Sequence, residues 1–232
     1  MNANEKSLYL LGYSRVHMVE PGEHATGGAA DTLRLDSLRR HVQTFAPSGI
    51  VDLSERELVR LDFEEDFGVP VSRHIMDLDI SQNFLHSLPP RALLPLVALV
   101  ELSLAHNQFE IFPSALLVLP SLTALNLSHN KLEHFPVSAE SFSAGLPQLT
   151  TLDLAHNLLR SVPPCCGTSR QLQALNISHN PRMGAAPAQA SDEGLRHCHA
   201  LTELTATNCS LLEPPGPVSP LYSIIISIHL AS

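Results

Sequence analysis

Several residue types are scarce in this 232-residue sequence, which has no tryptophan, three tyrosines and only 16% charged residues. Lys and Arg together number 14 against 23 Asp and Glu, which gives a formal net charge of −9. A surface with so few basic residues is poorly suited to the phosphates of nucleic acid or to an anionic membrane. We therefore expect neither as a general partner.

Cysteine is also rare, and the four residues Cys165, Cys166, Cys198 and Cys209 all lie in the last third of the chain. The N-terminal residues lack the continuous apolar core of a secretory signal. The apolar run near the C-terminus has about 11 residues, whereas a transmembrane helix needs about 20. These features predict an intracellular, cytoplasmic protein in a reducing compartment, without a membrane span.

Motifs of common catalytic sites are missing as well. The sequence has no phosphate-binding glycine loop, no G-x-S-x-G elbow and no H-E-x-x-H zinc motif. Asp77 and Asp79 form a pair of carboxylates on one expected strand, but no general acid accompanies them. We expect no enzymatic activity and no cofactor.

The sequence does contain one spacing of apolar residues that recurs through most of its length. Residues 122–136 read L-x-x-L-x-L-x-x-N-x-L-x-x-F-P, and three other segments repeat this pattern from the L-x-L core onward. The residues that open the L-x-L core of each unit are Val51, Leu78, Leu102, Leu125, Leu152, Leu175 and Leu204. Their intervals of 23 to 29 residues and the closing L-P or F-P resemble the leucine-rich repeat family, in its intracellular type.

The resemblance implies an α/β repeat fold, a leucine-rich repeat solenoid. A curved parallel β-sheet would form its concave side, and short helices and irregular turns its convex side. We expect a flexible segment over residues 1–30, a capping helix over 31–47 with Asp31 as N-cap, and about seven repeats over 48–215. Residues 216–232 are expected to be an incomplete repeat or an uncapped apolar tail, with Ile224 in line with Leu204. Secreted members of this family usually carry cysteine clusters at both ends, and residues 1–50 contain no cysteine.

Three units are lengthened by insertions, at residues 62–74, 137–148 and 185–199. Ser138 to Gly145 begins with a cap-like serine and ends with glycine, which predicts one or two helical turns on the convex side. A second such helix is expected over residues 191–201.

An asparagine recurs after each L-x-L core, where its amide can satisfy backbone groups of its own turn and of the adjoining unit. We predict a structural role for this asparagine column, which ends in a cysteine. Its members are Asn83, Asn107, Asn130, Asn157, Asn180 and Cys209.

A histidine precedes the asparagine in four consecutive units, at His106, His129, His156 and His179. Stacking would place these side chains about 5 Å apart, the separation of neighbouring strands. Duplication of a solvent-edge residue explains the column, and a partner contact or a pH-sensitive ridge is the functional alternative. A metal or redox protein using this column, or the cysteines, is a remote alternative; residues 165–166 and 197–199 have suitable side chains without a recognised ligand spacing. We expect no metal.

The concave sheet is the usual binding surface of such solenoids. Alternation along each strand should turn residues such as Ala124, Asn126 and Ser128 outward. Six of these outward positions are acidic, and none is lysine, arginine or aromatic. We predict partner binding by Asp52, Asp77, Asp79, Glu101, Asn126, Asp153 and Glu203.

The first four acidic residues are predicted to receive a basic protein segment. The sequence thus favours a non-catalytic protein-protein interaction module or adaptor. The alternative is a regulatory or substrate-recognition subunit of a phosphatase or a ubiquitin ligase.

Overall fold

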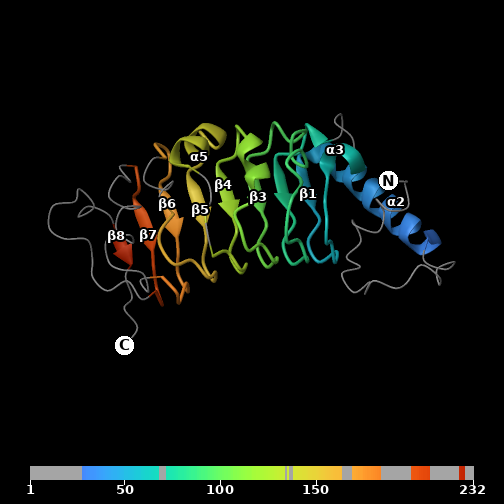
Figure 1. The fold of residues 1–232 in the computed structure, drawn as a ribbon. Coiled ribbons are helices and arrows are strands. Elements are labelled where there is room, and N and C mark those ends of the chain that lie inside the picture. The colour runs from blue at the N-terminus through green and yellow to red at the C-terminus, as the bar shows by residue number, and fades with distance from the viewer. Residues whose placement is uncertain are drawn as a thin grey trace.

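The structure, a computed structural model, describes residues 28–67, 72–133, 135, 138–163, 169–183, 200–209 and 225–227. It contains one parallel sheet whose eight strands follow the order of the sequence, so that each repeat stacks on the one before it (Figure 1). The strands are β1 (Ile50–Asp52), β2 (Asp77–Asp79), β3 (Glu101–Ser103), β4 (Ala124–Asn126), β5 (Thr151–Asp153), β6 (Ala174–Asn176), β7 (Glu203–Thr205) and β8 (Ile225–Ser227). The predicted solenoid is confirmed.

The register of the sheet follows the apolar spacing. The seven residues that open the L-x-L cores, from Val51 to Leu204, lie opposite one another through β1 to β7. In β8, Ile226 pairs with Leu204, so the prediction that Ile224 would do so was wrong by two residues. A shift of two residues keeps the same side chains on each face of a strand, and Ile224, Ile226 and Ile228 fit either register equally well.

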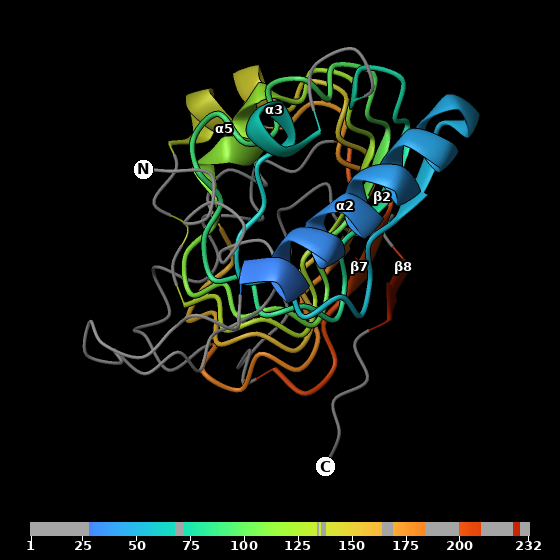
Figure 2. The same cartoon turned by 90° about the vertical axis from the view of Figure 1, so that its right-hand side faces the viewer.

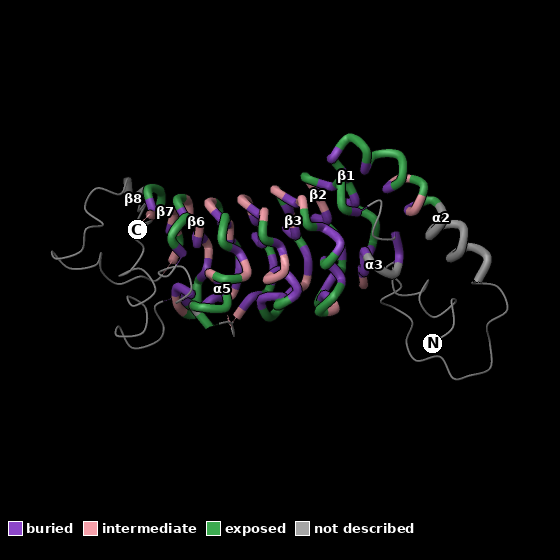
Figure 3. Tube along the Cα trace, turned by 90° about the horizontal axis from the view of Figure 1, so that it is seen from above, coloured by how far each residue is buried: buried purple, intermediate pink, exposed green. Residues whose placement is uncertain are grey.

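The core is a column of apolar side chains inside the stacked coils. Leu122, Leu125, Leu127 and Leu132 of one unit are all at most 1% exposed, and the same positions are buried along the array (Figure 3). Burying each such side chain contributes about 1.5–3 kcal/mol. Alternation places the centres of β1 to β7 in this core, which leaves the residues on either side of each centre on the concave face.

A helix covers the N-terminal end of the core (Figure 2). This helix, α2 (Gly28–Phe45), buries Leu38 and Val42 and donates a hydrogen bond from Arg39 Nε to Asp66 O at 3.0 Å. Because α2 starts at Gly28, Asp31 lies within it and is not the N-cap.

Phe45 lies three residues after the buried Val42, at the spacing of an apolar helical stripe, but it is 46% exposed. The chain enters a 3-10 turn, η1 (Ala46–Ser48), directly after Phe45, and Ala46 occupies the buried position instead. Pro47 lies within this turn, where the helix had been expected to stop.

The return segments carry short helical turns: α3 (Phe63–Asp66), η2 (Ser114–Val118) and α5 (Ala139–Gly145). Ser138 caps α5 as predicted, because its hydroxyl accepts a hydrogen bond from Ser141 N. A Cβ at Gly145 would lie 2.6 Å from Leu117 O, so the close approach of α5 to η2 requires glycine. The helix expected over residues 191–201 lies outside the described residues. No helix in the described part of the chain is long and apolar enough to cross a membrane.

Candidate functional site

The predicted partner-binding residues all flank strand centres on the concave face. Four of them come together on neighbouring strands, because Asp52 lies opposite Asp79 and Asp77 lies opposite Glu101. We call these four residues the acidic cluster. Strands in a sheet are about 4.8 Å apart, so the electrostatic fields of the four carboxylates add. The two other acidic residues stand apart, Asp153 between Asn126 and Asn176, and Glu203 between Ala174 and Ile225.

One column of the concave face also has a structural task that the prediction missed. In five strands the residue after the strand centre is Asp or Asn, and its Oδ1 accepts a hydrogen bond from the backbone N–H two residues later, at 2.8–3.1 Å. These residues are Asp52, Asp79, Asn126, Asp153 and Asn176. Asp and Asn commonly start turns in this way, so their shared position was the available signal. The second carboxylate oxygen of Asp153 accepts a hydrogen bond from Asn176 Nδ2 of the next strand at 3.3 Å.

Asp52 has the most closely held carboxylate of the acidic cluster. Its Oδ1 accepts hydrogen bonds from the hydroxyl of Ser54 at 2.6 Å and from Ser54 N at 2.8 Å. These bonds lower the pKa of Asp52 below its ordinary value, with smaller contributions from the positive charges of Arg56 and His41, while burial acts in the opposite direction. Asp52 is therefore ionised at neutral pH.

The third position that alternation had placed outward is buried in most units. Ser81, Ala105, Ser128, Ala155 and Ser178 are 4–9% exposed. The strands end two residues earlier, so the alternation of side chains stops and the backbone turns at this point. The concave face consequently offers two columns of side chains and not three.

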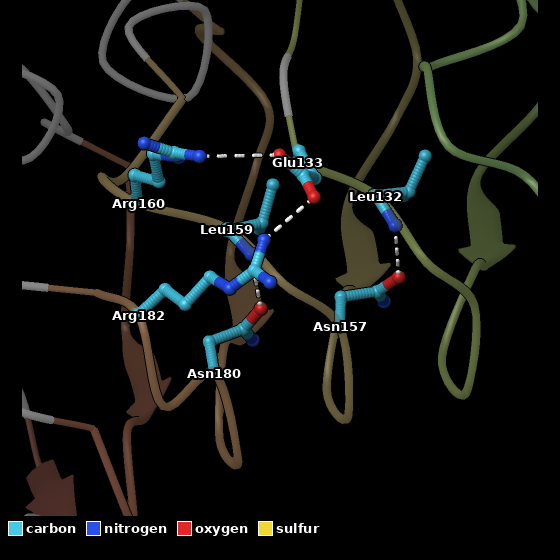
Figure 4. A network of polar contacts seen from close by, with 7 residues as sticks. All are labelled: Leu132, Glu133, Asn157, Leu159, Arg160, Asn180 and Arg182. Atoms are coloured by element: carbon cyan, nitrogen blue, oxygen red, sulfur yellow. Dashed lines mark hydrogen bonds and ion pairs between the residues drawn. The ribbon is translucent and has the colours of Figure 1, made fainter.

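The asparagine column lies just below this turn, and each of its five asparagines is at most 7% exposed. In Asn130, Nδ2 donates to the carbonyl oxygens of Leu127 and Ser128 in its own unit and of Leu104 in the preceding one, at 3.0–3.2 Å. Its Oδ1 accepts from Phe109 N of the preceding unit at 3.1 Å. The same bonds recur along the column, and two of them are drawn in Figure 4.

Cys209 takes the place of asparagine in the last of these turns. Its thiol donates a hydrogen bond to Ile177 O of the preceding unit at 3.0 Å, with a longer contact to Thr207 O. Burial raises the pKa of this thiol, so it is protonated at neutral pH and able to donate. Cys209 is a free cysteine, and residues 165, 166 and 198 lie outside the described residues.

The four histidines form a stacked column, which we call the histidine ladder (His106, His129, His156 and His179). Their ring centroids are 4.0, 4.0 and 4.1 Å apart, and neighbouring rings are within 12° of parallel. All four residues have φ between 53° and 56°, in the left-handed region. Histidine is one of the few residues enriched there.

The backbone fixes the spacing of the ladder. The backbone N–H of each of its histidines donates to a backbone carbonyl of the next unit, at 2.7–3.0 Å. Gln82 and Asn208 hold the same position before and after the histidines, also with positive φ. Asn208 Nδ2 lies 3.0 Å from His179 Nδ1. The left-handed backbone, which the repeat pattern alone did not reveal, therefore aligns all these side chains.

Two histidines of the ladder, His129 and His156, have shifted pKa values. Partial burial lowers the pKa of His129 below its ordinary value of 6.5, and the neighbouring imidazoles of His106 and His156 lower it further. Burial and His179 lower the pKa of His156 in the same way, while Asp153 opposes both shifts. His129 and His156 are therefore electrostatically coupled to neighbouring imidazoles and to one carboxylate of the concave face.

The parallel orientation of the four imidazole rings is relevant to the alternative that the histidine ladder binds a metal. Imidazole nitrogens in parallel planes point side by side, whereas a tetrahedral metal needs ligands that converge on one point. In the part of the chain that the structure describes, no group of three or more His, Cys, Asp or Glu side chains could hold a metal ion. Residues 197–199 lie outside that part.

An ion-pair network links three repeats on the flank of the solenoid (Figure 4). Glu133 accepts hydrogen bonds from Arg182 Nη1 at 2.6 Å and from Arg160 Nη2 at 3.4 Å. The bond from Arg182 is the main reason why the pKa of Glu133 lies below its ordinary value. Arg160 and Arg182 are therefore paired with Glu133, in a part of the solenoid separate from the acidic cluster.

Comparisons with known proteins agree with this architecture. Two family models described as leucine-rich repeats match residues 73–132 and 148–168. No curated protein matches the chain. Similar solved structures include the TLR13–ssRNA13 complex, at 26% identity over 77% of this chain with a TM-score of 0.62. The leucine-rich repeat domain of the type III effector XopL is 21% identical over 84%, with a TM-score of 0.61.

A third similar structure is the Drosophila Toll–Spatzle complex, at 22% identity over 68% of this chain with a TM-score of 0.55. This chain covers 24%, 63% and 20% of the TLR13, XopL and Toll–Spatzle chains, respectively. Likeness at this level shows a shared solenoid fold, which is generally an interaction scaffold.

Proposed function

We propose that this chain, which is a leucine-rich repeat protein, is a non-catalytic interaction module or adaptor that receives a basic protein segment on its concave face. The observation that carries the proposal is the acidic cluster, in which four carboxylates on three adjacent strands face the same side. None of the positions flanking the eight strand centres is Lys or Arg. A local excess of charge of one sign attracts a partner of the other sign and speeds its association.

The test uses a pair of variants with equal change of charge. Asp77→Asn with Glu101→Gln removes two register neighbours from the acidic cluster, whereas Glu110→Gln with Glu140→Gln removes two exposed acids elsewhere. A lysine-rich peptide is the probe, and its association rate is measured by stopped flow at several salt concentrations. We expect the cluster variant to slow association several-fold at low salt and the control variant to change it far less.

A fuller variant adds Asp52→Asn and Asp79→Asn. Asparagine should keep the turn hydrogen bond at these positions, because Asn126 and Asn176 already make it in other repeats. The fold should therefore survive, with a change in stability under about 0.5 kcal/mol. Equal association rates for the parent and the quadruple variant, with the same salt dependence, would contradict the proposed function. Affinity capture with the parent and the quadruple variant side by side would then identify which natural partners depend on the acidic cluster.

We also propose that the protein works in a reducing, cytoplasmic compartment. The thiol of Cys209 supports this, because its S–H replaces an asparagine amide as hydrogen-bond donor and an oxidised sulfur would lose the proton. Fractionation of cells expressing the tagged chain tests the placement. Recovery from the secretory pathway, with Cys209 oxidised, would contradict it.

A further inference from the structure

Three large apolar side chains are exposed beside the acidic cluster. Phe45 is 46% exposed, Ile50 59% and Met76 50%, and we call these residues the apolar corner. Core residues of the same repeats, such as Val51 and Leu78, are at most 1% exposed. Apolar side chains that gather on a surface, unlike scattered single ones, commonly mark an interaction site.

The backbone brings the three residues of the apolar corner together around one turn. The hydroxyl of Ser48 donates to Phe45 O at 2.6 Å and contacts Ile50 O at 3.3 Å. Met76 N donates to Gly49 O at 2.7 Å, and a Cβ at Gly49 would be only 2.6 Å from Met76 Cε. The side chain of Met76 therefore lies over Gly49, the residue that precedes Ile50.

The apolar corner is continuous with the acidic cluster. Ile50 and Asp52 flank the centre of β1, while Asp77 and Asp79 flank the centre of β2 directly opposite them. These four residues form a two-by-two grid on the concave face, about 5 Å across the strands and about 7 Å along them. Three corners of the grid are carboxylates and the fourth is an exposed isoleucine. A ligand that contacts both Asp52 and Asp77 therefore lies beside Ile50.

We propose that the partner segment is amphipathic, with basic residues that pair with the acidic cluster and a large apolar side chain that packs against Phe45, Ile50 and Met76. This inference rests on the proposed function and specifies the chemistry of its ligand. Exposed charge pairs mainly steer association and contribute little affinity. Desolvation of large apolar side chains at the centre of an interface contributes most of the binding energy, so an apolar anchor supplies what the acidic cluster lacks.

Two synthetic peptides test the inference with the full chain. One consists of alternating lysine and serine, and the other has a single central serine replaced by phenylalanine. Affinities are measured by calorimetry at the same salt concentration. We expect the phenylalanine peptide to bind about tenfold more tightly, the change that about 1.4 kcal/mol produces.

The gain should depend on the apolar corner and not on exposed apolar residues in general. Ile50→Thr with Met76→Gln should abolish the gain in affinity from phenylalanine and leave binding of the lysine-serine peptide unchanged. Val97→Thr with Ile111→Thr is the matched control, since Val97 and Ile111 are 53% and 56% exposed at other sites, and it should retain the gain. Circular dichroism verifies the fold, and Ile50→Thr alone serves if the double variant unfolds.

The outcomes separate the two proposals. Equal affinity of both peptides for the parent, or a gain that survives loss of the apolar corner, overturns the inference and leaves the proposed function standing. Binding of neither peptide overturns the proposed function, and the inference falls with it.

Discussion

The asparagine column and the histidine ladder are one residue apart in every central repeat, but they lie on opposite sides of the same turn. Each asparagine is buried and directs its amide at backbone groups of two units. Each histidine has a left-handed backbone, stacks on its neighbours and keeps an edge toward solvent. Stacking of repeats therefore aligns identical residues in two kinds of column. In one the side chains are buried and bind the backbone, and in the other they face solvent.

Substitutions within the array show how different the two requirements are. Glutamate, glutamine, histidine and asparagine all occupy the ladder position, at Glu55, Gln82, the four histidines and Asn208. The asparagine column is interrupted only at its two ends, by Arg56 and Cys209. We conclude that the ladder position requires tolerance of positive φ, while the column position requires a particular set of donors and acceptors.

Among substitutions that test this comparison, Asn130→Ala should lower the stability of the fold most. It leaves Phe109 N without its acceptor in a buried turn and removes one of the two amide donors that reach the carbonyl oxygens of Leu104 and Leu127. We expect the free energy of unfolding to fall by about 1–3 kcal/mol, measured by urea denaturation. An unchanged midpoint would mean that the turn satisfies these groups in another way.

His129→Val should have a smaller but clear effect. Valine is branched at Cβ and strained at φ 54°, so we expect a loss of about 1–2 kcal/mol. His129→Asn is the control, because Asn208 already occupies this position of the turn. If valine and asparagine give the same urea midpoint, the left-handed backbone does not constrain this position.

Cys209→Asn should extend the asparagine column by one unit. The new amide would donate to Ile177 O, as the thiol does, and also offer an acceptor that sulfur provides poorly. We expect a gain of about 0.5–1 kcal/mol in the free energy of unfolding. A loss of stability would show that this last turn differs in shape from the others.

The smallest effect is the pH dependence of the ladder. His129 and His156 have pKa values below 6.5 in the fold, so the unfolded chain binds more protons just below that pH. Stability should therefore fall as the pH drops below 6.5 and level off below the lowered pKa values. At pH 7.5, parent and His129→Asn should differ by under about 0.5 kcal/mol.

Nuclear magnetic resonance titration of the imidazole signals measures the coupling directly. In the parent, His129 and His156 should titrate below their ordinary pKa of 6.5, because burial and neighbouring imidazoles disfavour their charged forms. His156→Asn removes one of the imidazoles that lower the pKa of His129, so the pKa of His129 should rise in this variant. An unchanged pKa of His129 would show that stacking has no electrostatic consequence.

Much of the fold could be read from the sequence because one physical requirement repeats. Each unit must bury the same leucines at the same spacing, so the starts from Val51 to Leu204 predict the strand register without knowledge of the loops. The spacing fails at β8, where alternate isoleucines fit two registers. It also fails at Phe45, because periodicity does not show where a helix gives way to a 3-10 turn.

The candidate site was less predictable, since it depends on backbone conformation. The grouping of Asp52, Asp77, Asp79 and Glu101 followed from strand alternation, but the turn hydrogen bonds of Asp52 and Asp79 did not. Alternation was extended two residues too far at Ser81 and Ser128, where the strand has already ended. The apolar corner depends on the path between α2 and β1, which lies outside the repeat pattern.

The constant spacing of the turn has a consequence for how such a chain can change in length. From each strand centre to the column residue there are always five steps, as from Leu78 to Asn83 and from Leu204 to Cys209. The units as a whole vary from 23 to 29 residues, so every difference is absorbed on the return side. An inserted residue between strand and asparagine would break bonds in two neighbouring repeats, whereas a longer return loop or an added whole repeat keeps every one of them. Grafts and deletions are therefore best placed in the return loops or made in complete units.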